Sequence, residues 1–194
     1  RALRMSRGLG DVYKRQLVMS DYKEYQRWLE LVRLIELPHW DDLPNFDLYM
    51  DQVVALMTEY TGPLGLEAVT PAMVNNYVKN KVIVAPTKKK YQVMQIADIL
   101  LITLLKQSFS IQEIRSGIDR VTASEYPKQA YDRFIDLVNN KIKHMGLSRP
   151  DRNANNLTDQ LLEAVSNMIV DQLETNQLVK VVKDSKKHQP TKIK

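Results

Sequence analysis

Apolar residues recur every three to four positions through most of the chain, which is the spacing of amphipathic α-helices. Prolines, glycines and polar runs interrupt this pattern and mark the connections between helices. The pattern predicts helices at residues 21–36, 46–60, 70–80, 92–107, 110–121, 126–145 and 157–175. The fourth of these is apolar on more than one face, as expected for the central helix of a small domain. The sequence therefore predicts a mainly α fold.

Three of these helices begin at residues that commonly cap helices. Asp47 is expected to cap the second helix, because its carboxylate can accept a hydrogen bond from a free backbone N–H. Thr70 is expected to do the same for the third helix, where Pro71 suits the first helical position. Ser110 and Glu113 have the spacing of a capping box at the start of the fifth helix.

The segment at residues 70–91, TPAMVNNYVKNKVIVAPTKKKY, combines an amphipathic helix with a basic loop. The apolar face, expected to pack inward, consists of Met73, Val74, Tyr77 and Val78. The opposite face consists of Asn75, Asn76, Lys79 and Asn80. An asparagine amide offers a hydrogen-bond donor and an acceptor side by side, which matches the edge of adenine in the major groove of DNA.

A short apolar strand at residues 81–84 and the lysine triplet at residues 88–90 follow this helix. A lysine cluster after a strand suits a loop that lies along phosphates. The preceding helix, the glycine-containing turn at 61–69 and the helix at 70–80 have the order of a helix-turn-helix. Together they predict a helix-turn-helix followed by a small β wing. A polar helix face and a lysine-rich loop are also typical of an ordinary solvated surface, and that alternative stays open.

Net positive charge is concentrated in this segment and at the two ends of the chain. The formal net charge is +5, yet residues 1–16 carry +4 and residues 180–194 carry +5. Residues 17–179 therefore carry −4, although residues 68–97 among them hold five lysines and no acidic residue. Such segregation attracts a polyanion to one surface and repels it elsewhere, so it favours a nucleic-acid partner.

The run MVNNYVKNKVIVAPTKKKY resembles the second helix and wing of the MerR-type winged helix-turn-helix. Asn75 and Asn76 stand where that type usually has Arg and Tyr, and Lys81 stands where it usually has glycine. The wider segment, from LPHWDDLPNFDLYMDQV to IADILLITLLKQSFSIQEI, resembles the bacterial family called domain of unknown function 1836 (DUF1836) over roughly residues 37–121. This resemblance implies a MerR-like DNA-binding domain, and at least one relative is regarded as a transcriptional repressor.

The expected function is therefore sequence-specific binding of double-stranded DNA by a transcriptional regulator, with repression as the expected mode. The two adjacent asparagines are expected to read base edges, with Ala72 close by. Thr70, Lys79 and Tyr91 are expected to contact phosphates, and the lysine triplet to follow the backbone or enter the minor groove. The expected contact residues are Thr70, Ala72, Asn75, Asn76, Lys79, Lys88, Lys89, Lys90 and Tyr91. The alternative function is a non-catalytic protein-interaction module on the same winged-helix scaffold.

Four segments are expected along the chain. Residues 1–16 resemble a translated sequencing-adapter remnant and are set aside from fold reasoning, with a native basic tail as the alternative. Residues 17–122 are expected to form the winged helix-turn-helix domain with its N-terminal helix, and residues 123–179 a C-terminal helical region. Residues 180–194 are expected to form a basic, disordered tail.

The last predicted helix has a wide apolar stripe, made of Leu161, Leu162, Val165, Met168, Ile169 and Leu173. The stripe either completes the core of one chain or pairs with a second subunit. By analogy with MerR-like regulators, a homodimer through the C-terminal helices is expected, since two-fold readers match palindromic DNA. The sequence leaves open whether these helices sense a small-molecule effector.

No catalytic residue, cofactor or metal site is predicted. The absence of cysteine excludes disulfides, thiol nucleophiles and zinc–thiolate sites, which fits a reducing cytoplasm. The three histidines are scattered, and neither a glycine-rich phosphate loop nor a serine elbow occurs. No apolar run reaches the roughly 18–20 residues that a membrane span needs. The sequence thus predicts a cytoplasmic, non-enzymatic protein.

Overall fold

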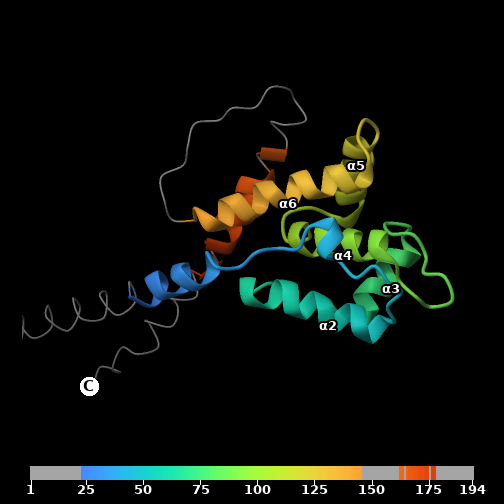
Figure 1. Cartoon of the computed structure of the whole chain (residues 1–194), viewed down its shortest axis with the longest axis horizontal. Coiled ribbons are helices and arrows are strands. Elements are labelled where there is room, and N and C mark those ends of the chain that lie inside the picture. Colours follow the sequence, from blue (N-terminus) through green and yellow to red (C-terminus); the bar gives the residue numbers. More distant parts are fainter. Residues whose placement is uncertain (1–22, 146–161, 164, 175, 178–194) are drawn as a thin grey trace, which may run out of the picture.

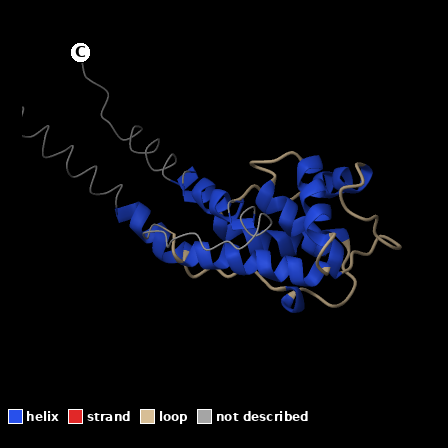
Figure 2. Ribbon diagram, turned by 90° about the horizontal axis from the view of Figure 1, so that it is seen from above, coloured by secondary structure: helices blue, strands red, loops and turns tan. Residues whose placement is uncertain are grey.

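The computed structural model describes residues 23–145, 162–163, 165–174 and 176–177. The elements in chain order are η1 (Trp40–Asp42), α2 (Met50–Thr61), η2 (Gly62–Leu64), α3 (Pro71–Lys79), α4 (Val93–Leu105), α5 (Ile111–Thr122) and α6 (Pro127–Lys143). Residues 23–32 and the described residues between 162 and 177 are also helical. Within this described part of the chain no strand is present, so the mainly α prediction is confirmed (Figure 2).

Helix α4 is the centre of the hydrophobic core. Its residues Ile96, Ile99 and Ile102 are fully buried, as expected for a helix that is apolar on several faces. Helices α2 and α5 pack against it, and Figure 1 shows α4 between α2 and α6. The buried side chains form one cluster from Leu29 to Leu173. Residues on both sides of position 122 therefore contribute to one core.

Two predicted helix starts are confirmed by their capping hydrogen bonds. The hydroxyl of Thr70 accepts the backbone N–H of Met73 (3.3 Å), and Pro71 occupies the first position of α3. Ser110 and Glu113 form the predicted capping box, with each side chain accepting the backbone N–H of the other (3.3 and 2.8 Å). These caps fix the N-terminal ends of α3 and α5.

The predicted cap at Asp47 is wrong. Helix α2 begins at Met50 with Tyr49 as its N-cap, and Asp47 is exposed. The helix starts late because Leu48 forms an isolated antiparallel bridge with Tyr91, with N–H···O distances of 2.9 and 2.8 Å. The extended backbone at Leu48 excludes a helical turn there. This bridge ties the start of α2 to the chain just before α4.

The C-terminal helical residues pack onto the same chain. Leu162, Ile169 and Leu173 of the predicted apolar stripe are buried in the common core. The hydroxyl of Tyr25, in the helix at residues 23–32, donates to the carboxylate of Glu174. The helix at residues 23–32 therefore contacts the far end of the C-terminal helical segment, at one end of the molecule (Figure 1).

Some predictions lie outside the described residues. They concern the segments 1–16 and 180–194, the linker at 148–156 and Leu161. Among the helices that the structure does describe, none has the length and apolar character to cross a bilayer. The same described residues contain no cluster of three or more His, Cys, Asp or Glu side chains suited to a metal ion.

Candidate functional site

Helix α3 exposes the polar face that the sequence predicted. Val74 and Tyr77 are buried against the core, at 0% and 3% exposure. The exposed residues of the helix are Pro71, Ala72, Asn75, Asn76 and Lys79. No hydrogen bond from the side chain of Asn75 to another described residue is formed, so both halves of its amide are available to a ligand. The helix therefore presents a short polar surface to solvent, while its apolar face packs against the core.

Asn80 is a functional candidate that the predicted set of contact residues lacks. It is the C-cap of α3, and its amide N–H groups donate to the backbone oxygen and to the side-chain Oδ1 of Asn76 (2.8 Å each). This contact orients the Asn76 amide and uses one of the two lone pairs of its side-chain oxygen. The sequence placed Asn80 on the polar face, but only the helix end in the structure shows this pairing.

The end of α3 is a Schellman motif with a lysine at the position that glycine usually occupies. The N–H of Lys81 donates to the oxygen of Val78 (3.0 Å), and the N–H of Val82 donates to the oxygen of Tyr77 (2.9 Å). Lys81 has a φ of 57°, in the left-handed region. A side chain with a Cβ is strained there, so lysine is retained against a conformational cost.

The strand predicted at residues 81–84 is not formed. Val82 and Ile83 are buried at 1% and 2% exposure, so the apolar character of this run was correctly placed in the core. However, the N–H groups of both residues point back to the oxygen of Tyr77, at 2.9 and 3.4 Å. Backbone N–H groups that bond to the end of a helix in this way cannot also pair with a neighbouring β-strand.

The predicted wing is a loop closed by a tight turn rather than a β-sheet. The N–H of Lys90 donates to the oxygen of Thr87 (2.9 Å), and the central residues Lys88 and Lys89 have φ values of 50° and 65°. Positive φ at both central positions is the mark of a type I′ turn, which favours Asn-Gly. Only isolated bridges, Thr87 with Lys90 and the one at the base of the loop, occur in this region of the structure.

Lys90 and Tyr91 differ from the exposed lysines of the turn. Lys90 is half-buried, with its ammonium 5.6 Å from the centre of the Tyr49 ring, in a cation–π contact. The side chain of Tyr91 is only 3% exposed, and burial raises the pKa of its hydroxyl. The predicted phosphate contact of Tyr91 therefore requires correction: its ring belongs to the core and supports the loop from beneath.

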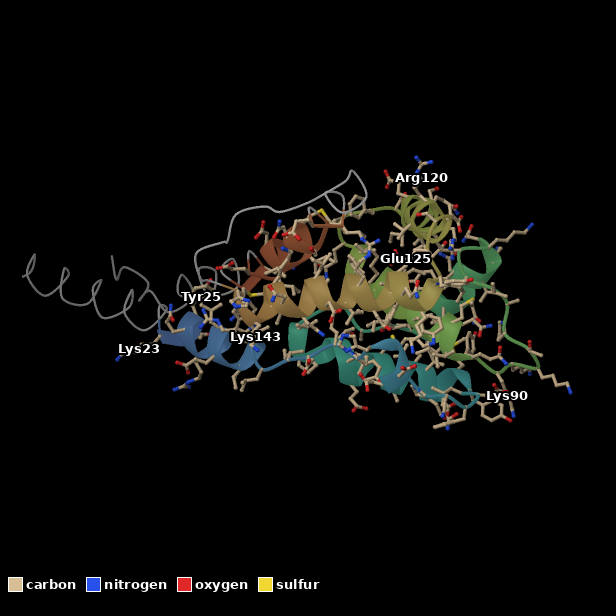
Figure 3. All side chains as sticks on the ribbon, turned by 45° about the horizontal axis from the view of Figure 1, so that its top comes forward. Lys23, Tyr25, Lys90, Arg120, Glu125 and Lys143 are labelled. Carbon is tan, nitrogen blue, oxygen red and sulfur yellow. The ribbon has the colours of Figure 1, made fainter. Side chains whose placement is uncertain are left out.

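The polar face of α3 and the lysine-rich turn lie at one end of the molecule. Figure 1 shows α3 beside the loop that follows it, and Figure 3 labels Lys90 at this end, far from Lys23 and Lys143. Helix α3 and the loop after it carry Lys79, Lys81, Lys88, Lys89 and Lys90, none of which forms an ion pair with a described residue. By contrast, three other lysines pair with carboxylates, as in Lys106–Glu67, Lys128–Asp41 and Lys141–Glu163. No described carboxylate therefore pairs with the lysines at this end.

A buried ion pair behind α3 was not predicted. Arg115 of α5 lies 3.4 Å from Asp98 of α4 and 2.6 Å from Asp119, and it donates to the backbone oxygen of Val82 (3.3 Å). Burial raises the pKa of the Asp98 carboxyl from its ordinary value of 3.8 to about 6, and the Arg115 guanidinium opposes this rise. The available sequence signal was a lone aspartate within the most apolar helix.

Asp98→Asn should stabilise the protein at pH 7.5. Because the folded-state pKa is raised, the stability contributed by the neutral carboxyl is complete below pH 3.8 and is lost as pH rises through about 6. Asparagine stays neutral, so the variant should gain about 1–3 kcal/mol at pH 7.5 and little near pH 4. Urea unfolding at both pH values measures this difference, with Asp47→Asn, at an exposed position outside this network, as the control. A variant less stable than the parent at pH 7.5 would show that the Arg115 pair outweighs burial.

Comparison with known families gives one match. Residues 38–134, half of the chain, match the family described as Domain of unknown function (DUF1836). This range contains η1, α2, α3, the lysine-rich turn, α4 and α5, and it ends within α6. Searches of curated proteins and of solved structures gave no match. The chain is therefore a member of the DUF1836 family.

Proposed function

We propose that the protein is a transcriptional regulator that binds double-stranded DNA sequence-specifically through a MerR-like winged helix-turn-helix. Helix α2, the turn through η2 and helix α3 supply the helix-turn-helix, and the loop at residues 84–91 supplies the wing. The resemblance of MVNNYVKNKVIVAPTKKKY to the MerR type supports this assignment. The resemblance to the DUF1836 family, in which at least one relative is regarded as a transcriptional repressor, favours repression. The observed wing is a turn without strands, so it resembles a shortened version of that element.

One observation carries the proposal: lysines without an ion pair to a described residue lie on α3, which exposes two amides, and on the loop beside it (Figure 1). Four of these lysines, Lys79, Lys81, Lys88 and Lys89, are exposed. Three of the four have left-handed backbone conformations. Selection for stability alone would favour glycine or asparagine at such positions. A strained cation retained at an exposed turn suggests a role in binding an anion. The phosphate backbone of DNA is the polyanion that fits amides and lysines together.

In this proposal α3 lies in the major groove. Asn75 and Asn76 contact base edges, with Ala72 close to the groove floor, and Lys79 contacts phosphate. The hydroxyl of Thr70 accepts a hydrogen bond within α3, and its own hydrogen remains able to donate to a phosphate. The lysines of the type I′ turn follow the backbone of the adjacent minor groove. Palindromic sites would then be bound by a homodimer.

Because the inner side of the C-terminal stripe is buried in its own chain, the proposed dimer requires another surface. The helix at residues 23–32 exposes Leu31, at 61%, and Leu34 in the following turn is 81% exposed. The same helix contacts the C-terminal helical residues through the Tyr25–Glu174 hydrogen bond. We propose that the dimer forms at this end of the molecule, which leaves α3 of each subunit free.

Asn75→Ala should relax base preference without abolishing DNA binding. Loss of a bidentate amide contact removes about 1–3 kcal/mol of discrimination at one base position, while the phosphate contacts remain. Selection of bound duplexes from a random library, followed by competition binding with single-base variants, measures this effect. Gln112→Ala, which removes an exposed amide from α5, is the matched control and should leave the preference intact. An unchanged preference in Asn75→Ala would remove α3 from the role of reader.

A protein-interaction module is the second candidate, because apolar side chains are exposed beside the basic turn. Phe46 and Val84 are each 63% exposed, and Tyr49 is 52% exposed. A partner protein with an acidic, partly apolar surface would fit them. Gel retardation separates the two functions: a DNA binder should retard duplex with an affinity that falls steeply with salt, because counterions are released from phosphates. An interaction module should not retard duplex DNA.

A further inference from the structure

The described helices line a cavity of about 380 Å³ that is partly open to solvent, on the side of α4 away from α2. Its walls come from α4, α5, α6 and the C-terminal helix, and they are mainly apolar, as at Leu101, Phe109 and Phe134. This volume is within the range of sites that hold small organic ligands. Because the cavity is partly open, a small molecule can reach its apolar walls from solvent.

Gly117 keeps this cavity open. It lies in the middle of α5 and lines the cavity, although glycine within a helix is about 1 kcal/mol less favourable than alanine. A Cβ at this position would meet no atom within 4 Å, and the backbone there is not left-handed. Neither close packing nor backbone conformation therefore requires glycine. What glycine at position 117 does provide is free volume in the cavity.

The polar groups on the cavity wall select the chemistry of an occupant. Asp98 and Glu113 are the acidic residues among those that line it: the Asp98 carboxylate pairs with Arg115, and the Glu113 carboxylate caps α5. The hydroxyl of Thr122, which also lines the cavity, donates to the backbone oxygen of Ile118. Carboxyl oxygens accept hydrogen bonds and repel anions, so a polar group that enters the cavity should be a donor. We propose that the cavity binds a small, mainly apolar molecule that carries an amine or another hydrogen-bond donor.

An occupant would be connected to α3 through one side chain. Asp98 lines the cavity, and Arg115 joins Asp98 to the oxygen of Val82 in the turn that ends α3. A donor that binds Asp98 competes with Arg115 and thereby changes the hold on this turn. Such an occupant is an effector of DNA binding; this role rests on the proposed function, whereas the binding site does not.

N-Phenyl-1-naphthylamine tests the site, because it is apolar, carries one N–H donor and fluoresces strongly in apolar surroundings. Titration of the full chain should show one site with micromolar affinity. Gly117→Leu should fill the cavity and weaken binding by about tenfold or more, whereas Gly117→Ala should raise the melting temperature and retain binding. The 8-sulfonate derivative of the same molecule should bind at least about tenfold more weakly, because its anion faces carboxyl groups.

Equal affinity of the probe for the parent and for folded Gly117→Leu would overturn the site, and folding is checked by circular dichroism. Equal affinity for the amine and its sulfonate would overturn the chemical class. Saturation with the amine should also shift the backbone amide resonances of Lys81 and Val82, and unchanged resonances would overturn the link to α3. These measurements need no DNA. A failure of DNA binding would therefore contradict the proposed function and would not affect the test of the binding site.

Discussion

Replacement of Lys79, Lys81, Lys88 and Lys89 by glutamine should remove most of the affinity for duplex DNA. These lysines are exposed and form no ion pair with described residues, so each is free to neutralise a phosphate. Each lost phosphate contact lowers the slope of log affinity against log salt by about 0.9, so the slope should fall by about 3–4. At roughly 0.1 M salt the affinity should fall on the order of 100-fold or more. Fluorescence anisotropy with labelled duplex at several salt concentrations measures both quantities.

The matched control has the same change in net charge elsewhere on the surface. Glutamine replaces Lys23, Arg27, Arg120 and Lys143, which are all exposed and lie outside α3 and the turn. Long-range attraction alone would make the two quadruple variants equivalent, whereas direct phosphate contact would affect only the first. Equal losses in both variants would show that the basic end is not the binding surface.

The combined substitution Lys81→Gly, Lys88→Asn and Lys89→Gly should stabilise the fold and weaken DNA binding at once. All three positions have φ between 50° and 65°, where glycine and asparagine are relieved of the strain that lysine bears. The net gain should be about 2 kcal/mol, since the greater freedom of glycine in the unfolded chain offsets part of the relief. Urea unfolding measures the gain, and anisotropy measures the loss of affinity.

Alanine at the same three positions separates conformation from charge. This variant loses the same three positive charges, but its Cβ atoms keep the left-handed strain. It should therefore bind DNA as weakly as the glycine and asparagine variant, without its gain in stability. If both variants gained stability equally, mutual repulsion of the lysines rather than backbone strain would be the cost at these positions.

Local signals in the sequence were sufficient for the helices and for most of the exposed surface. Thr70 and Ser110 predicted their helix starts correctly, because the side chain and the N–H that it accepts lie only three residues apart. The 3.6-residue period correctly divided α3 into a buried side with Val74 and Tyr77 and an exposed side with Asn75. Such features depend on residues that are close together in the sequence, so the sequence alone is enough to predict them.

Features set by distant contacts were missed. Asp47 resembled a cap, but the bridge of Leu48 with Tyr91, across more than forty residues, holds the backbone extended there. The same bridge helps to bury Tyr91, which a basic surrounding sequence suggested was exposed. The neighbouring residues in the sequence do not distinguish a tyrosine that is buried in the core from one that contacts a phosphate.

Backbone conformation at the lysines could not be predicted either. Lys81, Lys88 and Lys89 adopt the left-handed conformation although lysine carries no preference for it. The resemblance to the MerR type, which usually has glycine at the first of these positions, was the available hint. The contact of Arg115 with Asp98 joins two helices, and its sequence trace was a single acidic residue in an apolar run.

The most direct measurement for the proposed DNA surface is a nuclear magnetic resonance titration of the isotopically labelled protein with a duplex selected from a random library. DNA binding through α3 and the lysine-rich turn should progressively shift the backbone amides of residues 72–81 and 87–90 and leave residues 23–32 unaffected. Shifts centred on another surface, or none at DNA concentrations that saturate a gel-retardation assay, would contradict it.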